Sequence, residues 1–341
     1  MKDQRYVTAA EQHSSDRATQ HGAGPEHSKV AFVLSGGGSL GSIQVGVVEA
    51  LMEQGVFPDI IVGTSVGALN GAWLARHPTL EGVRELREIW ATLSEKRVFT
   101  GGRVRAFLRM LAGKPNLFTN EGIQNLIDRH LGDVTFDDLP VPLVVTAVDL
   151  DTGEPAVFHS GSLASAILAS TAIPAVFPSV TIDGHRYVDG GLLDHFGVEV
   201  AYEQGATHIV AIDCPHLPPK GVHGILAPMA RALWVSVRHL RRLGAKRFEF
   251  DPRMLTLEPE VDIDSYKMTD FSRTTELIQQ AQSWAVNYLR EQGQAFLEHL
   301  DFGIANTGLP AVSLASEDSE PALQESRVVV STSAQETQRL P

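Results

Sequence analysis

Short apolar runs alternate along the chain with segments in which apolar residues recur every three or four positions. The run 30–34 (VAFVL) is typical of a buried strand, and it stops at a cluster of glycines. In 39–54 the apolar residues fall on one helical face, and Gly55 ends this pattern. A second apolar run at 59–62 leads through another glycine pair into a predicted helix that ends at about Arg76.

The same alternation continues through the rest of the chain. Further strands are predicted at 143–148, 156–159 and 209–212. Continuous apolar strands separated by helices are typical of a mainly parallel sheet with helices on both faces, so we expect a three-layer α/β/α fold. The Asp183-Gly184 pair between two β-branched runs predicts an antiparallel hairpin just before Asp189.

The two ends of the chain differ in composition from its body. Residues 1–28 and 305–341 are rich in polar residues, so burial there cannot offset the entropy of ordering. We therefore predict a disordered N-terminal tail over 1–28, one catalytic domain over 29–304 and a flexible C-terminal tail over 305–341. A single core of this size needs no metal or disulfide to be stable.

Composition narrows the classes of function. The 28 Lys and Arg against 41 Asp and Glu leave a net charge of −13, which argues against a nucleic-acid binder, because such a protein needs cations to neutralise phosphates. The single cysteine, Cys214, excludes an intramolecular disulfide. No His/Cys spacing suits zinc, so we expect no metal site and no cofactor. Without a long apolar run or a signal-peptide core, we expect a cytoplasmic protein.

Residues 63–67 (GTSVG) match the pattern G-x-S-x-G of a nucleophile elbow. In such an elbow a sharp turn between strand and helix holds the serine in strained geometry, and the glycines avoid side-chain clashes. An apolar run precedes Ser65 and a helical segment follows it, as an elbow requires. The alternative is a plain turn in which Ser65 caps the helix.

A second glycine cluster, 36–41 (GGGSLG), lies between the first strand and the first helix. It satisfies the dinucleotide pattern G-x-G-x-x-G, but that fingerprint needs an acidic residue at the end of the second strand, whereas Asp59 stands at its beginning. The other interpretation is an oxyanion hole made of consecutive backbone N–H groups. Both glycine clusters follow parallel strands, so we expect them at the carboxyl edge of the sheet.

Ser65 also needs a base. No histidine after it lies in a distinctive motif. Asp189 leaves the predicted hairpin and is followed by Gly190 and Gly191, which would allow its carboxylate to approach another loop closely. An ordinary Asp-Gly turn is the alternative.

Together these motifs resemble the patatin-like phospholipase family of serine lipid acyl hydrolases. The resemblance rests on 35–38, 63–67 and 189–192, and on 169–178 (ASTAIPAVFP), which is similar to the family's Ala-Ser-x-Ala-x-Pro stretch. It covers about 30–213, most of the predicted domain.

The resemblance implies a Ser-Asp dyad without histidine. Ser65 would be the nucleophile and Asp189 its base, and the backbone N–H groups of the loop Gly36, Gly37 and Gly38 would form the oxyanion hole. The chain departs from the family where the glycine loop commonly carries Arg or Lys, because Leu40 stands there. It departs again after the Asp-Gly-Gly stretch, where the family often has Asn followed closely by Pro and this chain has 194–197 (DHFG). Within this segment His195 is a candidate second partner of the dyad.

Residues 224–244 predict an amphipathic helix. Its apolar stripe consists of Leu226, Met229, Leu233, Val237 and Leu240. Roughly opposite lie Arg231, Arg238 and Arg242, with Arg241 beside them. The favoured interpretation is a core-packed helix with a solvated basic face, and the alternative is peripheral contact of these four arginines with an anionic membrane.

The predicted function is hydrolysis of carboxylic esters of lipids, such as phospholipids or lysophospholipids, through an acyl-enzyme on Ser65. Acyl transfer to an acceptor alcohol through the same intermediate is one alternative. A catalytically silent lipid-binding scaffold is another, against which the intact Ser65, Asp189 and glycine loop argue. The sequence leaves the head group, acyl length and oligomeric state open.

Overall fold

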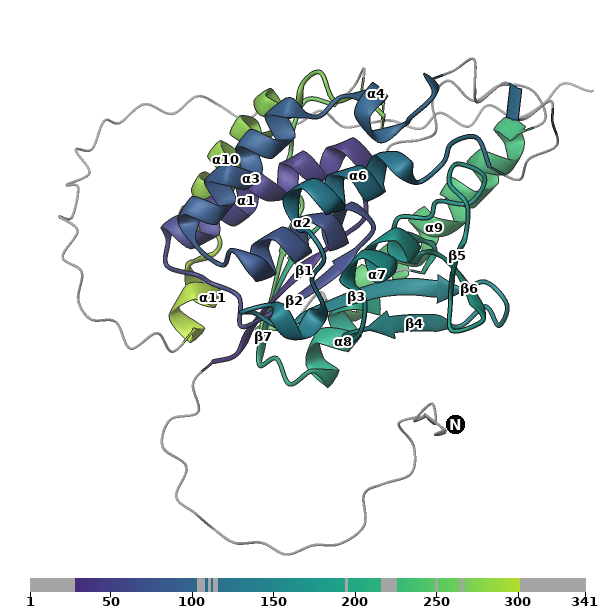
Figure 1. The fold of residues 1–341 in the computed structure, drawn as a ribbon. Helices are drawn as coiled ribbons and strands as arrows, with labels where there is room; N and C mark the ends of the chain where they lie inside the picture. The colour runs from purple at the N-terminus through teal and green to yellow at the C-terminus, as the bar shows by residue number, and fades with distance from the viewer. Residues whose placement is uncertain are drawn as a thin grey trace, which may run out of the picture. The chain divides into compact units, whose positions relative to one another are not determined.

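A computed structural model gives the fold of this protein (Figure 1). It describes residues 28–102, 108–109, 112, 116–193, 196–215, 226–248, 251–263, 266–267 and 269–300. His195 and, apart from Ser28, the predicted tails therefore lie outside the described residues, and the domain boundaries remain predictions.

One mixed sheet organises the described residues. Its strands are β1 (Val30–Leu34), β2 (Ile60–Thr64), β3 (Leu143–Asp149), β4 (Pro155–Phe158), β5 (Val180–Ile182), β6 (His185–Asp189), β7 (His208–Ile212) and β8 (Met254–Leu257). Hydrogen-bonded pairs link the strands in the order β5-β6-β3-β2-β1-β7-β8, and β4 also pairs with β3. The pairs β3-β2, β2-β1, β1-β7 and β7-β8 are parallel, whereas β4, β5 and β6 pair antiparallel. The mainly parallel sheet and the hairpin before Asp189 are thus confirmed.

Helices cover both faces of the sheet. The α-helices are α1 (Ser42–Glu53), α2 (Val66–Arg76), α3 (Leu80–Thr92), α4 (Glu95–Val98), α6 (Glu121–His130), α7 (Leu163–Ser170), α8 (Phe196–Glu203), α9 (Leu226–Phe248), α10 (Thr274–Glu291) and α11 (Gln294–His299). Three short 3-10 helices are η1 (Gly38–Gly41), η2 (Phe136–Asp138) and η3 (Gly190–Leu192).

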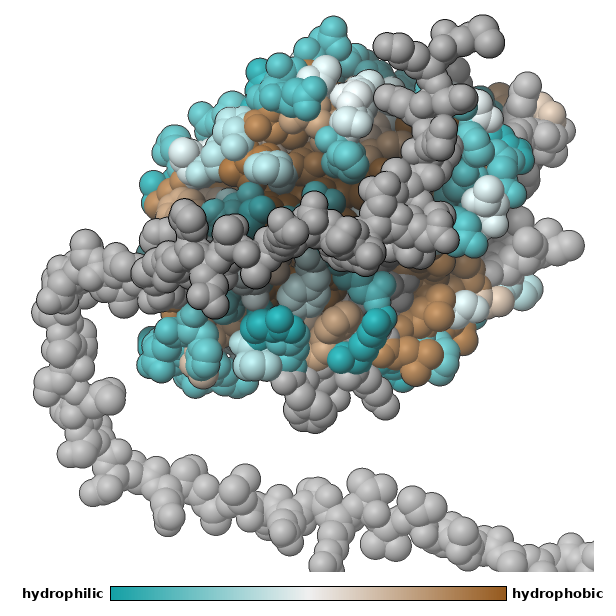
Figure 2. Space-filling view, turned by 90° about the horizontal axis from the view of Figure 1, so that it is seen from below, coloured by the Kyte–Doolittle hydropathy of each residue, from teal (hydrophilic) through white to brown (hydrophobic). Residues whose placement is uncertain are grey.

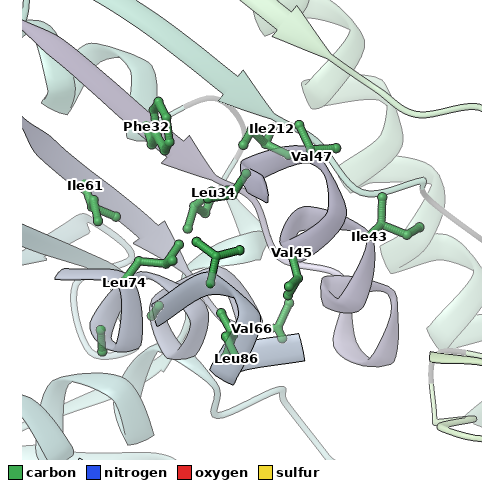
Figure 3. Packing of buried hydrophobic residues seen from close by; sticks show 14 of the residues in the cluster. Phe32, Leu34, Ile43, Val45, Val47, Ile61, Val66, Leu74, Leu86 and Ile212 are labelled. Atoms are coloured by element: carbon green, nitrogen blue, oxygen red, sulfur yellow. The ribbon is translucent and has the colours of Figure 1, made fainter. Parts of the chain in front are cut away.

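Alternate residues of each strand point to opposite faces and build two cores. Phe32, Leu34 and Ile61 pack with α1, α2 and α3 in the larger core, which Figure 3 shows from close by. Ala31 and Ile60 face the other way and pack with α8. Because both strand faces are buried, the central strands read as continuous apolar runs, and the expected three-layer fold is confirmed.

The first helix and the sheet edge differ from the sequence-based prediction. The helix expected from residue 39 begins as the 3-10 turn η1, and α1 starts only at Ser42. Strand β8 was not predicted, because its four residues are too short to show a period.

Helix α9 does not pack as the favoured interpretation held. Of the predicted apolar stripe, Val237 is buried, but Leu233 and Leu240 are exposed. The described side chains of this helix therefore do not form one buried stripe. None of the helices described in the structure is both long and apolar enough to cross a membrane.

Candidate functional site

The register of β3 brings Ser65 and Asp189 together. Strand β2 ends with Thr64 opposite Thr146, and β6 ends with Asp189 opposite Ala147, the next residue of β3. Strand β4 pairs with 145–148, so it occupies one edge of β3, and β2 and β6 share the other. Since β2 is parallel to β3 and β6 antiparallel, their carboxyl ends meet head to head.

Ser65 has the backbone geometry of a nucleophile elbow. Its φ of 55° and ψ of −122° lie in a region that residues with a Cβ rarely adopt. A Cβ on Gly63 would lie 2.5 Å from the carbonyl oxygen of Gly67, and one on Gly67 would lie 2.1 Å from that of Leu34. The two glycines therefore allow the turn to pack against β1 while Ser65 stays strained.

The side chains of Ser65 and Asp189 form a buried hydrogen-bonded pair. Ser65 Oγ donates to Asp189 Oδ2 at 2.6 Å, and each residue is only 6% exposed. The other carboxylate oxygen, Oδ1, accepts from the backbone N–H of Gly191 at 2.8 Å. The serine is held from behind, since its own N–H donates to Ser170 Oγ at 2.7 Å.

Burial changes the acidity of this carboxyl group. Loss of water around Asp189 raises its pKa to about 6, although the hydrogen bonds from Ser65 and Gly191 favour the carboxylate and limit the rise. A carboxylate with this pKa is a stronger base than an ordinary aspartate and is still mostly ionised at neutral pH.

The glycine loop lies directly beside the serine. A Cβ on Gly36 would lie 3.2 Å from Ser65 Cβ and 3.9 Å from Oγ. Gly38 has a φ of 60° and lines the same cavity as Ser65. Within the described part of the chain, the N–H groups of Gly36 and Gly37 donate to no other group. Unpaired donors next to a nucleophile are suited to stabilising an oxyanion.

Three buried side chains tie the two ends of the glycine loop. Gln44 Nε2 donates to the carbonyl of Ser35 at 2.7 Å. Asn70 Nδ2 donates to the carbonyl of Gly41 and to Gln44 Oε1, both at 2.9 Å. Trp90 Nε1 completes the chain by donating to Asn70 Oδ1 at 2.9 Å. We call Gln44, Asn70 and Trp90 the loop brace. No sequence motif marks these residues, which is why the sequence did not predict their role.

An apolar cavity of about 120 Å³ opens at Ser65. Helices α2, α3 and α6 and the segment after α7 supply its walls, which include Leu69, Leu86, Trp90, Ile127 and Phe177. Trp90 also stacks on Phe271, with 6.1 Å between the ring centroids. An apolar space beside a nucleophile is suited to hold a hydrocarbon chain.

The other candidates contribute less to the site. His130 lines the cavity, where burial and the neighbouring Arg129 lower its pKa, so it is neutral at pH 7. Cys214 is fully buried against the glycine loop, and burial raises its pKa to about 12. Its thiol is therefore inert at neutral pH. The described residues contain no cluster of His, Cys, Asp or Glu that could hold a metal.

Comparison with known proteins matches the part of the chain that contains Ser65 and Asp189. The family model "Patatin-like phospholipase" matches residues 32–202, half of the chain. Patatin-like phospholipase domain-containing protein 7 of Rattus norvegicus is 31% identical over 186 residues, which are 54% of this chain but 13% of that protein. An uncharacterised NTE family protein of Mycobacterium bovis is 32% identical over 176 residues, 50% of this chain and 45% of that one.

One solved structure with a likeness to this chain is VipD from Legionella pneumophila, at 14% identity and a TM-score of 0.43 over 78% of this chain and 67% of that one. This chain spans only a small part of the rat protein, of which the matched residues make up 13%.

Proposed function

Because the chain belongs to the patatin-like phospholipase family, we propose that it is a serine acyl hydrolase that cleaves carboxylic esters of lipids. The observation that carries this proposal is the 2.6 Å hydrogen bond from Ser65 Oγ to the buried carboxylate of Asp189. A phospholipid or lysophospholipid is the substrate class, since its acyl chain matches the apolar cavity beside Ser65.

The proposed reaction proceeds in two steps. Ser65 Oγ attacks the ester carbonyl carbon while its proton passes to Asp189 Oδ2. The negative oxygen of the tetrahedral intermediate accepts from the backbone N–H groups of the glycine loop, chiefly Gly37 and Gly38. The ester C–O bond then breaks, and the leaving alcohol takes the proton from Asp189.

Water completes the cycle. It attacks the acyl-enzyme carbonyl and gives one proton to Asp189, which returns that proton to Ser65 as the fatty acid leaves. No histidine takes part in this scheme, because the carboxylate contacts the serine directly.

The test combines labelling with turnover. A fluorophosphonate probe should label the wild type and not Ser65→Ala, and only the wild type should release fatty acid from lysophosphatidylcholine. No labelling of the wild type would favour the silent scaffold. Labelling with acyl transfer to an added alcohol, but little release of free acid, would favour the acyltransferase. The expected cytoplasmic location remains a prediction, which cell fractionation would check.

A further inference from the structure

Helix α9 presents an unusual amount of apolar surface to water. Four of the seven large apolar side chains that are most exposed in the described structure lie on it: Leu233 (44%), Val235 (52%), Leu240 (42%) and Leu243 (54%). Figure 2 shows brown apolar patches on one face of the molecule, and Phe57, Leu108 and Leu150 are exposed outside α9, so exposure alone does not identify a binding face. The concentration on one helix requires a physical reason.

Cations accompany these apolar side chains. Arg231, Arg238 and Arg242 are exposed, and at about 100° per residue they fall within about 40° of one another around the helix. Leu233, Leu240 and Leu243 fall within about 80° on the other flank of the buried Val237. The two sides of α9 that flank Val237 thus carry an arginine row and a leucine row, and the exposed Val235 falls beside the arginines.

The arginines are available for an external partner. Within the described residues none of the three forms an ion pair, in contrast to Arg247 on the same helix, which pairs with Glu199. Arg231 and Arg238 instead lie over the ring of Trp234, at 4.7 and 5.1 Å from its centroid. These contacts order the two guanidinium groups and leave their hydrogen-bond donors exposed.

We propose that α9 is the surface on which this protein binds an anionic lipid bilayer. A protein with a net charge of −13 is repelled by such a surface as a whole, so a local group of cations has to supply the attraction. A bilayer also places negative charge directly above apolar chains, which matches arginine and leucine rows on a single helix. This inference adds a partner to the proposed lipid hydrolase, and its binding step is measured without turnover.

Binding is tested with the full chain carrying Ser65→Ala, so that the vesicles stay intact. This protein is sedimented with vesicles of equal parts phosphatidylcholine and phosphatidylglycerol, and with vesicles of phosphatidylcholine alone. We expect binding to the anionic vesicles that weakens as salt rises. Adding Arg238→Glu and Arg242→Glu should weaken it at least roughly 30-fold, given the attraction of each basic residue to an anionic surface. Adding Leu240→Ser and Leu243→Ser should weaken it without removing its salt dependence.

A matched charge control is Lys29→Glu with Arg290→Glu, which changes the net charge equally on two exposed residues outside α9. If this control weakens binding as much as the α9 variant, net charge and not the helix is responsible, and the inference is wrong. The inference is also wrong if the Ser65→Ala protein with an unchanged α9 binds neither kind of vesicle at low salt. A change of oligomeric state in the leucine variant would likewise contradict it, because the face would then be a protein interface.

Turnover separates this inference from the proposed function. With Ser65 intact, the Arg238→Glu/Arg242→Glu protein should hydrolyse a soluble short-chain ester as fast as the wild type and anionic vesicles more slowly. A protein that binds vesicles through α9 but hydrolyses no ester would retain the docking surface and overturn only the hydrolase.

Discussion

At the scale of single residues, the burial of Asp189, the proposed base, moves the titration of its carboxyl group into a mildly acidic pH range. Only the carboxylate can accept the proton of Ser65, and burial raises the pKa of this group to about 6. We therefore expect kcat/KM for a soluble ester to rise as the pH increases through about 6 and to level off above it. If kcat/KM for this ester does not change between pH 5 and pH 8, the assignment of Asp189 as the base is contradicted.

The same residue should reduce the stability of the fold. Because the folded pKa of about 6 exceeds the ordinary value of 3.8, the folded protein binds more protons than the unfolded chain between these values, and stability falls as the pH rises through this range. Above pH 7 the buried carboxylate costs up to about 3 kcal/mol. Asp189→Asn should lower the rate by roughly 10²–10⁴-fold and yet raise the free energy of unfolding at pH 8.

This stability gain should shrink as the pH falls towards 3.8, because the wild-type carboxyl group is then protonated in the folded state and increasingly protonated in the unfolded chain. Chemical denaturation of both proteins at pH 4.5 and pH 8 measures the difference. Equal stability of the two proteins at pH 8 would mean that Asp189 is not desolvated in solution.

Two glycines of the glycine loop, Gly36 and Gly37, should respond differently to the same methyl group. A Cβ on Gly37 would lie 2.7 Å from Cys214 Cβ, so Gly37→Ala must displace the chain and lose both stability and rate. A Cβ on Gly36 meets Ser65 Cβ at 3.2 Å and Oγ at 3.9 Å, a tight but tolerable contact. We expect Gly36→Ala to lower kcat by roughly 10²-fold, because the methyl group intrudes beside Ser65 Oγ where the oxyanion forms, with a small change in melting temperature. Equal losses of melting temperature in the two variants would contradict this distinction.

At the scale of elements, the loop brace links the wall of the cavity to the glycine loop. Trp90→Phe keeps an aromatic ring in the cavity but removes the N–H that Asn70 Oδ1 accepts. We expect a loss of about 1–3 kcal/mol of stability from the unpaired buried oxygen, and a fall in kcat with little change in KM because the loop loses its support.

Trp73→Phe is the matched control for this prediction. Trp73 lines the same cavity, and its Nε1 donates to the carbonyl of Gly82 at 2.7 Å, which is not connected to the glycine loop. It should lose stability without the selective fall in kcat. If both variants lower kcat alike, the brace is a structural feature of the core and does not position the loop.

The elements also show how far the sequence could predict this protein. The central strands were predictable because burial on both faces leaves a continuous apolar run, and the elbow and the glycine loop because each needs glycines at fixed positions. The meeting of Ser65 with Asp189 depends on the register of β3, which no local pattern encodes. The family resemblance supplied that pairing.

Contacts between side chains of different elements could not be predicted from the sequence. The loop brace and the cavity join side chains from α1, α2, α3 and α6, whose mutual placement is a tertiary property. Helix α9 was interpreted wrongly because its sequence pattern fits two different environments. Its apolar period is that of a packed helix, and the same period also suits a helix that lies on a membrane.

At the scale of the whole molecule, the cavity should set which acyl chains are accepted. Leu126 on α6 is half-buried and lines the cavity, so a larger side chain there has room to turn inward and shorten the space open to the substrate. Leu126→Trp should therefore reduce kcat/KM for long-chain p-nitrophenyl esters by roughly 10-fold or more while leaving the acetate ester nearly unaffected.

The control is Leu297→Trp on α11, a half-buried leucine that does not line the cavity. This control should show no dependence on chain length, and melting curves should show both variants folded. If Leu126→Trp slows the acetate and the long-chain esters to the same extent, the acyl chain lies elsewhere, and the cavity beside Ser65 is only a packing gap between α2, α3 and α6.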